Sequence, residues 1–221
     1  MSASSSSPSA SAPSRPYRST LRAEQAAHTR RRILEAAADC FAECGYAGTS
    51  LGDIATRASV SVETVKLNGP KRNLLLGAFE QAFTGTEGPE SVTARESAAE
   101  ILTLTDGERF LDGLVHWVAQ ANARTSALWV GFVSAGASDP HVGAALSELL
   151  ERRRADYRGA VEALVERDMV PVDVDRDDLA DALSFLMSPE GHDQLVRRSG
   201  WTMEHYEDWL GSTVRRLAVR A

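Results

Sequence analysis

Three polar side chains near residue 65, those of Thr64, Lys66 and Asn68, offer hydrogen-bond donors and acceptors that suit the groove of a nucleic acid. Val60 and Val65 are the apolar residues that can tie this segment to the rest of the chain. A helix with so few apolar residues is expected to pack along a narrow edge and to present its polar face outward. This pattern is typical of the recognition helix of a helix-turn-helix motif, which lies in the major groove of DNA. A surface helical hairpin without a partner is the alternative, because such patterns are short and degenerate.

Two short helices within residues 49–71 are predicted to position these side chains. Ser50 is a helix-start residue, and Asp53 follows three positions later, as in a capping box. The first helix is expected to end near residue 58, where Ser59 begins the turn. Ser61 can cap the second helix, with Glu63 in its first turn, where the helix dipole favours a carboxylate. The spacing therefore predicts two helices joined by a tight turn.

A longer helix is predicted before this pair, from Thr29 to Cys44. Apolar residues recur along it at intervals of four, and Gly45 follows in the position that commonly ends a helix. The run Arg30–Arg32 lies in the expected first turn, where the helix dipole disfavours cations. A DNA phosphate nearby would explain this placement, and Thr29 can cap the helix and donate to the same phosphate.

A fourth helix is predicted to begin at Pro70, because proline suits the first helical position. The free amides of its first turn, together with Lys71, would form a phosphate site. The stretch Gly85–Pro89 is expected to end the N-terminal domain.

The sequences on both sides of the predicted motif resemble the TetR family of transcriptional regulators. The upstream stretch resembles the family's first helix and entry turn, RRRILEAAADCFAECGYAGTSLGDIA at residues 30–55. The downstream stretch resembles its fourth helix, NGPKRNLLLGAFEQAF at residues 68–83. Residues 188–217 are similar to the last two helices of an actinobacterial-type subgroup. The resemblance implies a dimeric, all-helical DNA-binding protein, usually a repressor that a small ligand controls.

This resemblance also implies which residues contact DNA. Phosphate contacts fall on Thr29, Thr64 and Lys71. On the base-reading surface, Lys66 suits guanine, Asn68 suits adenine and Glu63 suits cytosine. The full set of predicted DNA contacts is Thr29, Arg31, Ser50, Ser61, Val62, Glu63, Thr64, Lys66, Leu67, Asn68 and Lys71.

The sequence departs from the family pattern within the motif. Ser59 stands where most of the family has Gly, so a left-handed backbone there would cost about 1 kcal/mol. Lys66 replaces the usual Tyr, and Asn68 replaces the usual Phe. The stretch 64–69 is one residue shorter than the common pattern, which predicts that the recognition helix ends early.

Composition predicts an all-α protein with two domains. The chain has 221 residues, of which 43% are hydrophobic and 6% aromatic, and Ala and Leu dominate the apolar set. Residues 1–84 carry 10 Lys/Arg against 7 Asp/Glu, and the remainder carries 14 against 24. A basic N-terminal domain (the head) joined to an acidic C-terminal domain (the body) is expected where only the N-terminal domain binds the phosphates of DNA.

We divide the chain into three parts. Residues 1–22 are a predicted disordered Ser/Ala/Pro-rich tail, ending in a basic arm formed by Arg15, Arg18 and Arg22 that can reach DNA or remain a solvated tail. Residues 23–84 form the predicted helix-turn-helix DNA-binding domain, and residues 85–221 form a helical ligand-binding and dimerisation domain.

The larger domain carries two predicted surfaces. The predicted ligand pocket is lined by Phe110, Leu114, His116, Trp117, Trp129, Phe132 and Tyr157. Core packing is the alternative role for each of these residues. The predicted dimer interface, on the two terminal helices, consists of Leu183, Leu186, Tyr206, Trp209, Leu210, Val214 and Leu217. The alternative is that both helices fold back on the body.

Other kinds of chemistry lack their sequence signatures. No nucleotide-binding, metalloprotease or serine-hydrolase motif occurs, so we expect neither catalysis nor a cofactor. Residues 173–184 fail the calcium-loop pattern, because Asp178 stands at position six and Ser184 at position twelve. Cys40 and Cys44, four residues apart on one helix, are expected to be reduced thiols. With neither a membrane span nor a secretion signal, we expect a cytoplasmic protein.

The leading hypothesis is a homodimeric repressor that binds a palindromic operator in double-stranded DNA and is released by an unknown small-molecule effector. A small-molecule-binding or partner-binding protein whose head no longer binds DNA is the first alternative, motivated by the shortened recognition helix and by Glu63. An enzyme is the last. Dependence of the DNA affinity on salt separates the first two hypotheses.

Overall fold

The structure is a computed structural model that describes residues 15–220, with the side chains of residues 21–92, 94–96 and 98–218. The predicted tail up to residue 14, and the side chains of Arg15 and Arg18, lie outside this description. The described residues form helices and no strands. These are α1 (Arg15–Gly48), α2 (Leu51–Ala58), α3 (Val62–Leu67), α4 (Lys71–Thr84), η1 (Val92–Ala94), α5 (Glu96–Leu102), α6 (Gly107–Ser138), α7 (Pro140–Val165), α8 (Arg176–Leu186), α9 (Pro189–His192), η2 (Asp193–Arg198) and α10 (Met203–Arg220). The predicted all-α fold class is confirmed.

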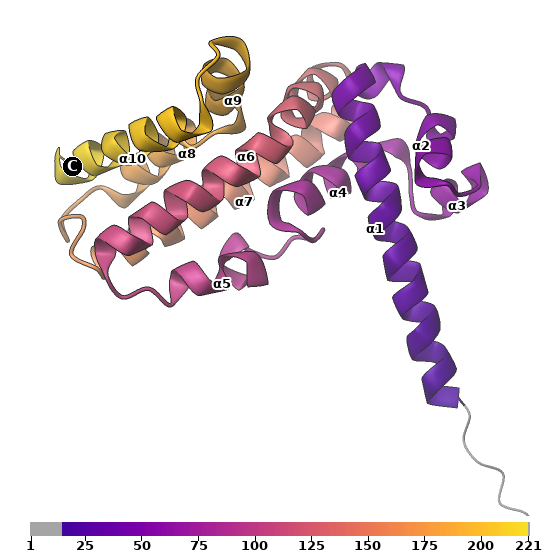
Figure 1. The fold of residues 1–221 in the computed structure, drawn as a ribbon, viewed down its shortest axis with the longest axis horizontal. Helices are drawn as coiled ribbons and strands as arrows, with labels where there is room; N and C mark the ends of the chain where they lie inside the picture. Colours follow the sequence, from indigo (N-terminus) through magenta and orange to yellow (C-terminus); the bar gives the residue numbers. More distant parts are fainter. Residues whose placement is uncertain (1–14, 221) are drawn as a thin grey trace, which may run out of the picture.

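Helix α1 begins 14 residues earlier than the sequence predicted, at Arg15 instead of Thr29. Its first turns project away from the rest of the molecule (Figure 1). Thr29 is therefore inside the helix and does not cap it, and Arg30–Arg32 do not lie in a first turn. The dipole argument for a phosphate at these arginines is wrong. The break at Gly45 has φ 69° and ψ 173°, which agrees with the predicted end of the helix.

The paired short helices form as predicted. The Ser50 side chain accepts from the Asp53 amide and the Asp53 carboxylate accepts from the Ser50 amide, which completes the capping box. Ser59 adopts the left-handed conformation, with φ 53° and ψ 48°, and Ser61 caps α3 by accepting from the Thr64 amide. Helix α3 has only six residues, so it ends early as predicted. Pro70 differs slightly from the prediction, because it caps α4 in an extended conformation instead of occupying its first turn.

The two longest body helices lie side by side (Figure 1). Helix α6 has 32 residues. Asp106 caps it, and Asp139 caps α7, where Pro140 takes the first helical position. Head and body share one apolar core, in which Phe41 and Phe79 of the head pack with buried residues of α6. The N-terminal helices and the body are therefore connected by close packing.

The terminal helices fold back on the body and complete a second apolar core. Asp175 caps α8 by accepting from the amides of Asp177 and Asp178, so the acidic run opens a helix. Ser188 caps α9, and Pro189 is its first residue. Four side chains of the predicted dimer interface are buried in this core, with at most 1% of their surface exposed: Leu183, Tyr206, Leu210 and Val214. This is a correction, because the protomer's own helices α6 and α8 occupy the surface that a partner would need.

A buried histidine makes stability depend on pH. His192 is 2% exposed, and its Nδ1 lies 3.0 Å from Ser126 Oγ. Burial is the main cause that lowers the pKa of His192 below its usual value, while Asp193 opposes the shift. The folded protein therefore resists protonation more than the unfolded chain, whose histidines titrate near about 6.5. The stability that this group contributes is present above that pH and is lost as pH falls below it.

We expect the melting temperature to fall between pH 7.5 and pH 5.5, and the His192→Gln variant to show a smaller fall than the unmodified protein. Thermal melts followed by circular dichroism at both pH values measure this difference. His141→Gln, at an exposed position, is the control and should keep the full pH dependence. An equal fall in His192→Gln would assign the effect to other groups.

Candidate nucleic-acid interface and ligand cavity

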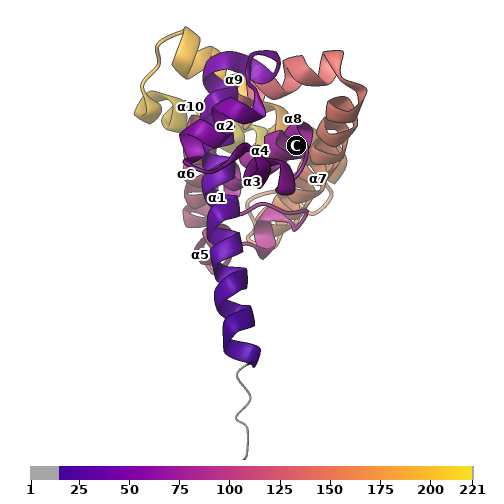
Figure 2. The same ribbon diagram turned by 90° about the vertical axis from the view of Figure 1, so that its right-hand side faces the viewer.

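Helix α3 is anchored by one fully buried side chain. Val65 is 0% exposed, whereas Leu67 is 88% exposed. The side chains of Glu63 and Lys66 are also largely exposed and lie 4.0 Å apart, so their ion pair is weak. Helices α2 and α3 lie on the face that Figure 2 turns toward the viewer. Helix α3 thus packs along a narrow edge and exposes a polar face, as predicted. Leu67 adds to that face an apolar side chain that suits a thymine methyl group.

Other predicted base-reading and phosphate residues make hydrogen bonds inside the head. The Asn68 side-chain amide donates to the Thr64 carbonyl at 2.8 Å, and the Asn68 carbonyl accepts from Arg30. The Thr64 hydroxyl lies 2.9 Å from Ser61 Oγ. The expected Asn68–adenine pair would require the amide to leave Thr64, so Asn68 ends the helix here instead of extending its reading surface. Ser50 and Ser61 are exposed caps, and Val62 is half-buried against the head core.

The Lys71 side chain is directed into the head. Its Nζ donates to the carbonyl oxygens of Tyr46 at 2.6 Å and Thr49 at 2.8 Å, and it lies 4.3 Å from the centre of the Tyr46 ring. Burial lowers the pKa of Lys71. The ammonium group therefore joins the start of α4 to the turn between α1 and α2. Lys71 therefore has a structural role inside the head, and its predicted phosphate contact stays a prediction.

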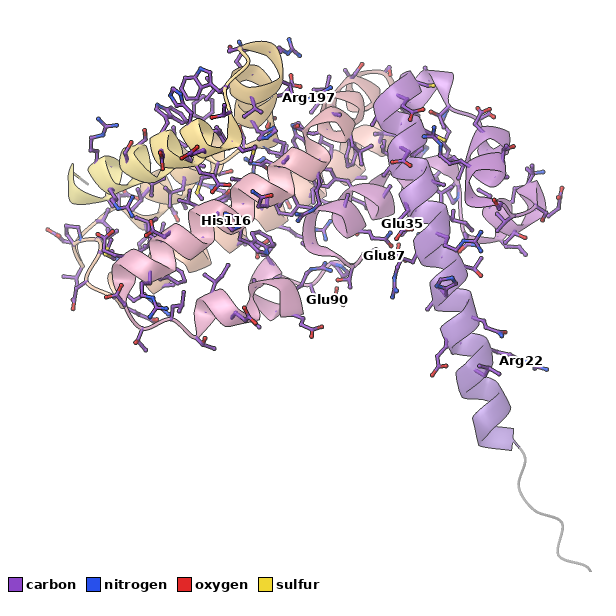
Figure 3. The ribbon with its side chains drawn as sticks, in the orientation of Figure 1. Arg22, Glu35, Glu87, Glu90, His116 and Arg197 are labelled. Carbon is purple, nitrogen blue, oxygen red and sulfur yellow. The ribbon has the colours of Figure 1, made fainter. Side chains whose placement is uncertain are left out.

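Two described arginines of α1 make side-chain contacts within the protein. Arg30 forms an ion pair with Glu87 at 2.7 Å, and Glu87 is labelled beside α1 in Figure 3. Arg32 donates to the Ala58 carbonyl at 2.5 Å, which ties α1 to the end of α2. Arg31 is exposed and Thr29 is half-buried.

Two further exposed arginines lie outside the predicted DNA contacts. Arg22 is exposed on the projecting part of α1 (Figure 3), so the prediction of a disordered tail is wrong for residues 15–22, which are helical. Arg72, in the first turn of α4, is exposed beside Lys71 and was missed. Its position directly after the lysine was the available signal, but helical spacing alone did not show that Lys71 would turn inward and leave Arg72 outward.

A cavity of about 140 Å³ lies among α4, α5, α6 and α7. Five residues of the predicted pocket line it, namely Phe110, Leu114, Trp117, Trp129 and Tyr157. Two others do not. His116 is exposed, with its Nδ1 3.0 Å from Glu207 Oε2, and Phe132 is buried in the core between head and body. Both are corrections, because they lie on sides of α6 that face away from the cavity.

Aromatic rings from two helices form much of the apolar wall. The ring centres of Phe79 and Trp129 are 5.1 Å apart, and those of Phe83 and Trp117 are 5.5 Å apart. Burial raises the pKa of Tyr157 to about 12, so its hydroxyl is neutral and donates to the Met187 carbonyl at 3.2 Å. Phe79 and Phe83 belong to α4, so the helix that follows the DNA-binding motif also contributes to the cavity. The sequence prediction did not include them.

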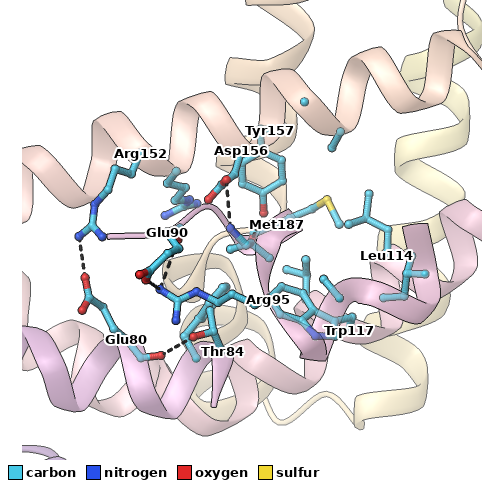
Figure 4. A pocket seen from close by; sticks show the side chains of 18 of the residues that line it. Glu80, Thr84, Glu90, Arg95, Leu114, Trp117, Arg152, Asp156, Tyr157 and Met187 are labelled. Carbon is cyan, nitrogen blue, oxygen red and sulfur yellow. Dashed lines mark hydrogen bonds and ion pairs between the residues drawn. The ribbon is translucent and has the colours of Figure 1, made fainter. Parts of the chain in front are cut away.

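One end of the cavity is polar and charged. Arg152 donates to Glu80 Oε1 at 2.7 Å, and Glu80 Oε2 accepts from the Gly88 amide at 2.9 Å. Arg95 donates to Thr86 and to the Gly88 carbonyl. In the close-up of Figure 4, Arg152, Glu80 and Glu90 lie at one side and Leu114 and Trp117 at the other. The cavity is therefore amphipathic.

Metal binding and membrane insertion find no support in residues 15–220. No group of three or more His, Cys, Asp or Glu side chains in the described part of the chain is arranged to hold a metal ion. Among the described helices, none has the length and apolar character needed to span a bilayer. Cys40 is buried, which raises its pKa, and Cys44 is exposed, and neither forms a disulfide.

Comparison with known proteins supports the predicted class. A family model for bacterial regulatory proteins of the tetR family matches residues 33–65, which span the second half of α1, all of α2 and α3 as far as Val65. No curated protein matches the chain.

Solved structures of bacterial regulators share the fold. A transcriptional regulator from Pseudomonas aeruginosa PAO1 is 21% identical, with a TM-score of 0.65 over 86% of this chain and 90% of that chain. A regulator from Saccharomonospora viridis, solved in complex with choline, is 23% identical, with a TM-score of 0.63 over 85% of this chain and 95% of the other. A TetR-family regulator from Rhodococcus sp. is 16% identical, with a TM-score of 0.69 over 86% and 98%. The predicted organisation, an N-terminal helix-turn-helix and a helical C-terminal body, is confirmed.

Proposed function

We propose that this chain is a DNA-binding transcriptional regulator, a repressor that a small ligand releases from its operator. The observation that carries the proposal is the geometry of α3 within the region that the tetR family model matches. Val65 is fully buried, while Lys66 and Leu67 face solvent on a helix capped at both ends. Such a helix contributes little to the apolar core, and its exposed side suits the major groove. The proposal includes neither catalysis nor a cofactor.

Helix α4 supports the proposed ligand control. Lys71 at its start is bonded to the turn that leads into the helix-turn-helix motif, and Phe79, Glu80 and Phe83 line the cavity. A ligand that binds one position of α4 more tightly than another would shift the head relative to the body. Arg124 of α6 holds the far end of α4 by donating to the carbonyls of Ala82 and Phe83 at 2.9 and 3.2 Å.

A homodimer on a palindromic operator completes the proposal. Phe185 of α8 is 79% exposed, and Leu186, Trp209 and Leu217 are half-buried on α8 and α10, which contact each other. The exposed Phe185, with half-buried apolar side chains on the neighbouring helix, supports this surface as the contact between two copies. A twofold pair of heads about 34–36 Å apart would match two half-sites on one face of DNA.

The proposal also includes a subgroup of the family and a cellular compartment. The similarity of residues 188–217 to an actinobacterial-type subgroup supports a place in that subgroup. A repressor of this kind would act in the cytoplasm, where its operator lies.

We expect Lys66→Ala to weaken operator binding by roughly five- to 150-fold, because one base contact contributes about 1–3 kcal/mol. Fluorescence anisotropy on DNA from upstream of the protein's own gene, at several salt concentrations, measures the effect. Arg109→Ala is the control, since Arg109 is exposed on the body at the start of α6. Unchanged affinity in Lys66→Ala would contradict the assignment of α3 as the recognition helix.

A protein whose head has lost DNA binding is the second candidate. The six-residue α3 and the exposed Glu63 beside Lys66 favour it, because a carboxylate repels phosphate. DNA affinity that does not fall as salt rises, or no affinity at any salt concentration, would support this candidate over the first.

A further inference from the structure

We propose that the cavity binds a small amphipathic carboxylate, whose apolar part packs on the aromatic wall and whose carboxylate accepts a hydrogen bond from Nε of Arg95. This inference rests on the proposed ligand control of DNA binding and names the chemical class of the ligand. Five observations lead to it: the buried guanidinium of Arg95, the unpaired donors of the cavity, the engagement of the other charged groups, the separation of polar and apolar ends, and the volume.

Arg95 is the most buried charge at the polar end. Its side chain is only 7% exposed, and its terminal nitrogens donate to Thr86 and to the carbonyls of Gly88 and Glu90. Its ion-pair partner, Glu90, lies 3.6 Å away and is itself 63% exposed. A buried guanidinium surrounded mainly by neutral carbonyl groups is incompletely neutralised. A carboxylate within the cavity would supply the missing counter-charge.

Two buried donors that line the cavity have no acceptor among the described residues. These are Arg95 Nε and Trp129 Nε1. A buried donor without an acceptor is costly, and each such group in a native structure requires an explanation. Both groups are donors, so they favour a ligand that carries acceptors. A cationic ligand would satisfy neither.

The other charges at this end are engaged with groups of the protein. The carboxylate of Glu80 is already paired with Arg152 and bonded to the Gly88 amide. Burial raises the pKa of Asp156, whose Oδ1 already accepts hydrogen bonds from the Ser91 hydroxyl and the Val92 amide. Arg153 lies over the rings of Trp129 and Tyr157 and donates to the Ser184 carbonyl, with no carboxylate partner in the described chain.

The shape of the cavity limits the apolar part of the ligand. At about 140 Å³ the cavity is close to the ~150 Å³ apolar cavities that bind benzene. Its apolar end, where Leu114 and Trp117 lie, is opposite the side where Arg152 and Glu80 meet (Figure 4). A single ring or a short chain that carries one carboxylate therefore fits both ends.

Three probes of matched size test the charge of the ligand. Phenylacetate, phenylacetamide and phenethylamine carry the same ring with a negative, neutral or positive head. Isothermal titration calorimetry on the full-length protein, without DNA, should show phenylacetate binding about tenfold more tightly than the amide, because hydrogen bonds to charged groups are the stronger ones. Equal or tighter binding of the amide or the amine, or no binding of any probe at millimolar concentration, overturns the proposal.

Two variants test the role of Arg95. Glu90→Gln removes its exposed counter-charge and should tighten phenylacetate binding severalfold without affecting phenylacetamide. Glu100→Gln, at an exposed position of α5 outside the cavity lining, is the control and should leave both affinities unchanged. Arg95→Gln should reduce the preference for phenylacetate to less than about twofold. Because Arg95 is buried, the Glu90→Gln result stands even if Arg95→Gln fails to fold, and unchanged or weaker phenylacetate binding by Glu90→Gln contradicts the proposal.

The two proposals fail in different ways. Preferential binding of phenylacetate by a protein that binds no DNA would retain the ligand assignment and reject the regulator. Operator binding that Lys66→Ala abolishes, together with no preference for the carboxylate, would retain the regulator and reject the ligand assignment.

Discussion

Replacing Phe132 with alanine is expected to lower the free energy of unfolding by about 3–5 kcal/mol. Phe132 is fully buried, and its ring centre lies 6.0 Å from that of Phe79 and 6.2 Å from that of Trp129. The change removes the apolar contacts of a whole ring and leaves a cavity that the rigid helices around it can fill only in part. Because Phe79 belongs to the head and Trp129 to the body, the lost contacts also join the two domains.

Urea unfolding followed by circular dichroism measures this effect. Val133→Ala, at the next position of α6, is the matched control, because Val133 is 41% exposed and should contribute less than about 1 kcal/mol. Carboxylate binding should be similar in the folded Phe132→Ala protein, since Phe132 does not line the cavity. A loss of stability no larger than that of Val133→Ala would show that head and body are not joined through this ring.

Replacing Leu210 with alanine is expected to cost about 2–5 kcal/mol of stability without directly removing a contact between protomers. Leu210 is 0% exposed and packs in the body core with Tyr206 and Val214 of the same helix. The sequence had placed these residues at the dimer interface. The structure encloses them under α6 and α8 instead, so truncation creates a cavity within one chain.

Phe185→Ala separates core packing from dimerisation. Phe185 is 79% exposed, so its truncation should change the stability of the protomer little and should raise the dissociation constant of the dimer. Sedimentation velocity across a range of concentrations gives the dimer constant, and denaturation at matched concentrations gives the stability. If Leu210→Ala abolished the dimer while leaving the stability unchanged, the assignment of Leu210 to the core would be wrong.

Local signals in the sequence predicted the helix-turn-helix motif almost residue by residue. Ser50 with Asp53, the left-handed Ser59 and the Ser61 cap all involve partners within four positions, so their chemistry can be recognised from spacing alone. The prediction placed the start of α1 at Thr29, because threonine is a common capping residue. The helix instead continues upstream to Arg15, through residues whose helix propensity is sufficient without packing against the rest of the protein. Propensity and capping signals competed there, and no packing information was available from the local sequence to decide between them.

The site residues likewise divide into those that local sequence signals predicted and those whose roles depend on tertiary contacts. Lys66 was correctly predicted to face solvent, because its neighbour Val65 takes the single buried position of α3. The roles of Lys71 and Arg95 were not predictable, since Lys71 binds carbonyl groups 22 and 25 positions away and Arg95 becomes important only where α4, α5 and α7 meet. His116 and Phe132 were misassigned because helical periodicity shows that a face is apolar or polar without showing which neighbour covers it.

The sequence by itself determined the helical class, the capped pair of short helices and the basic character of the head, because each depends on interactions between residues close in the chain or on composition. Only the tertiary structure decided that Tyr206 and Leu210 belong to the core, that Lys71 ties α4 to the head, and that a cavity with a buried arginine opens between α4 and the body. Those outcomes depend on which surfaces meet, and that is set by the joint packing of helices far apart in the sequence.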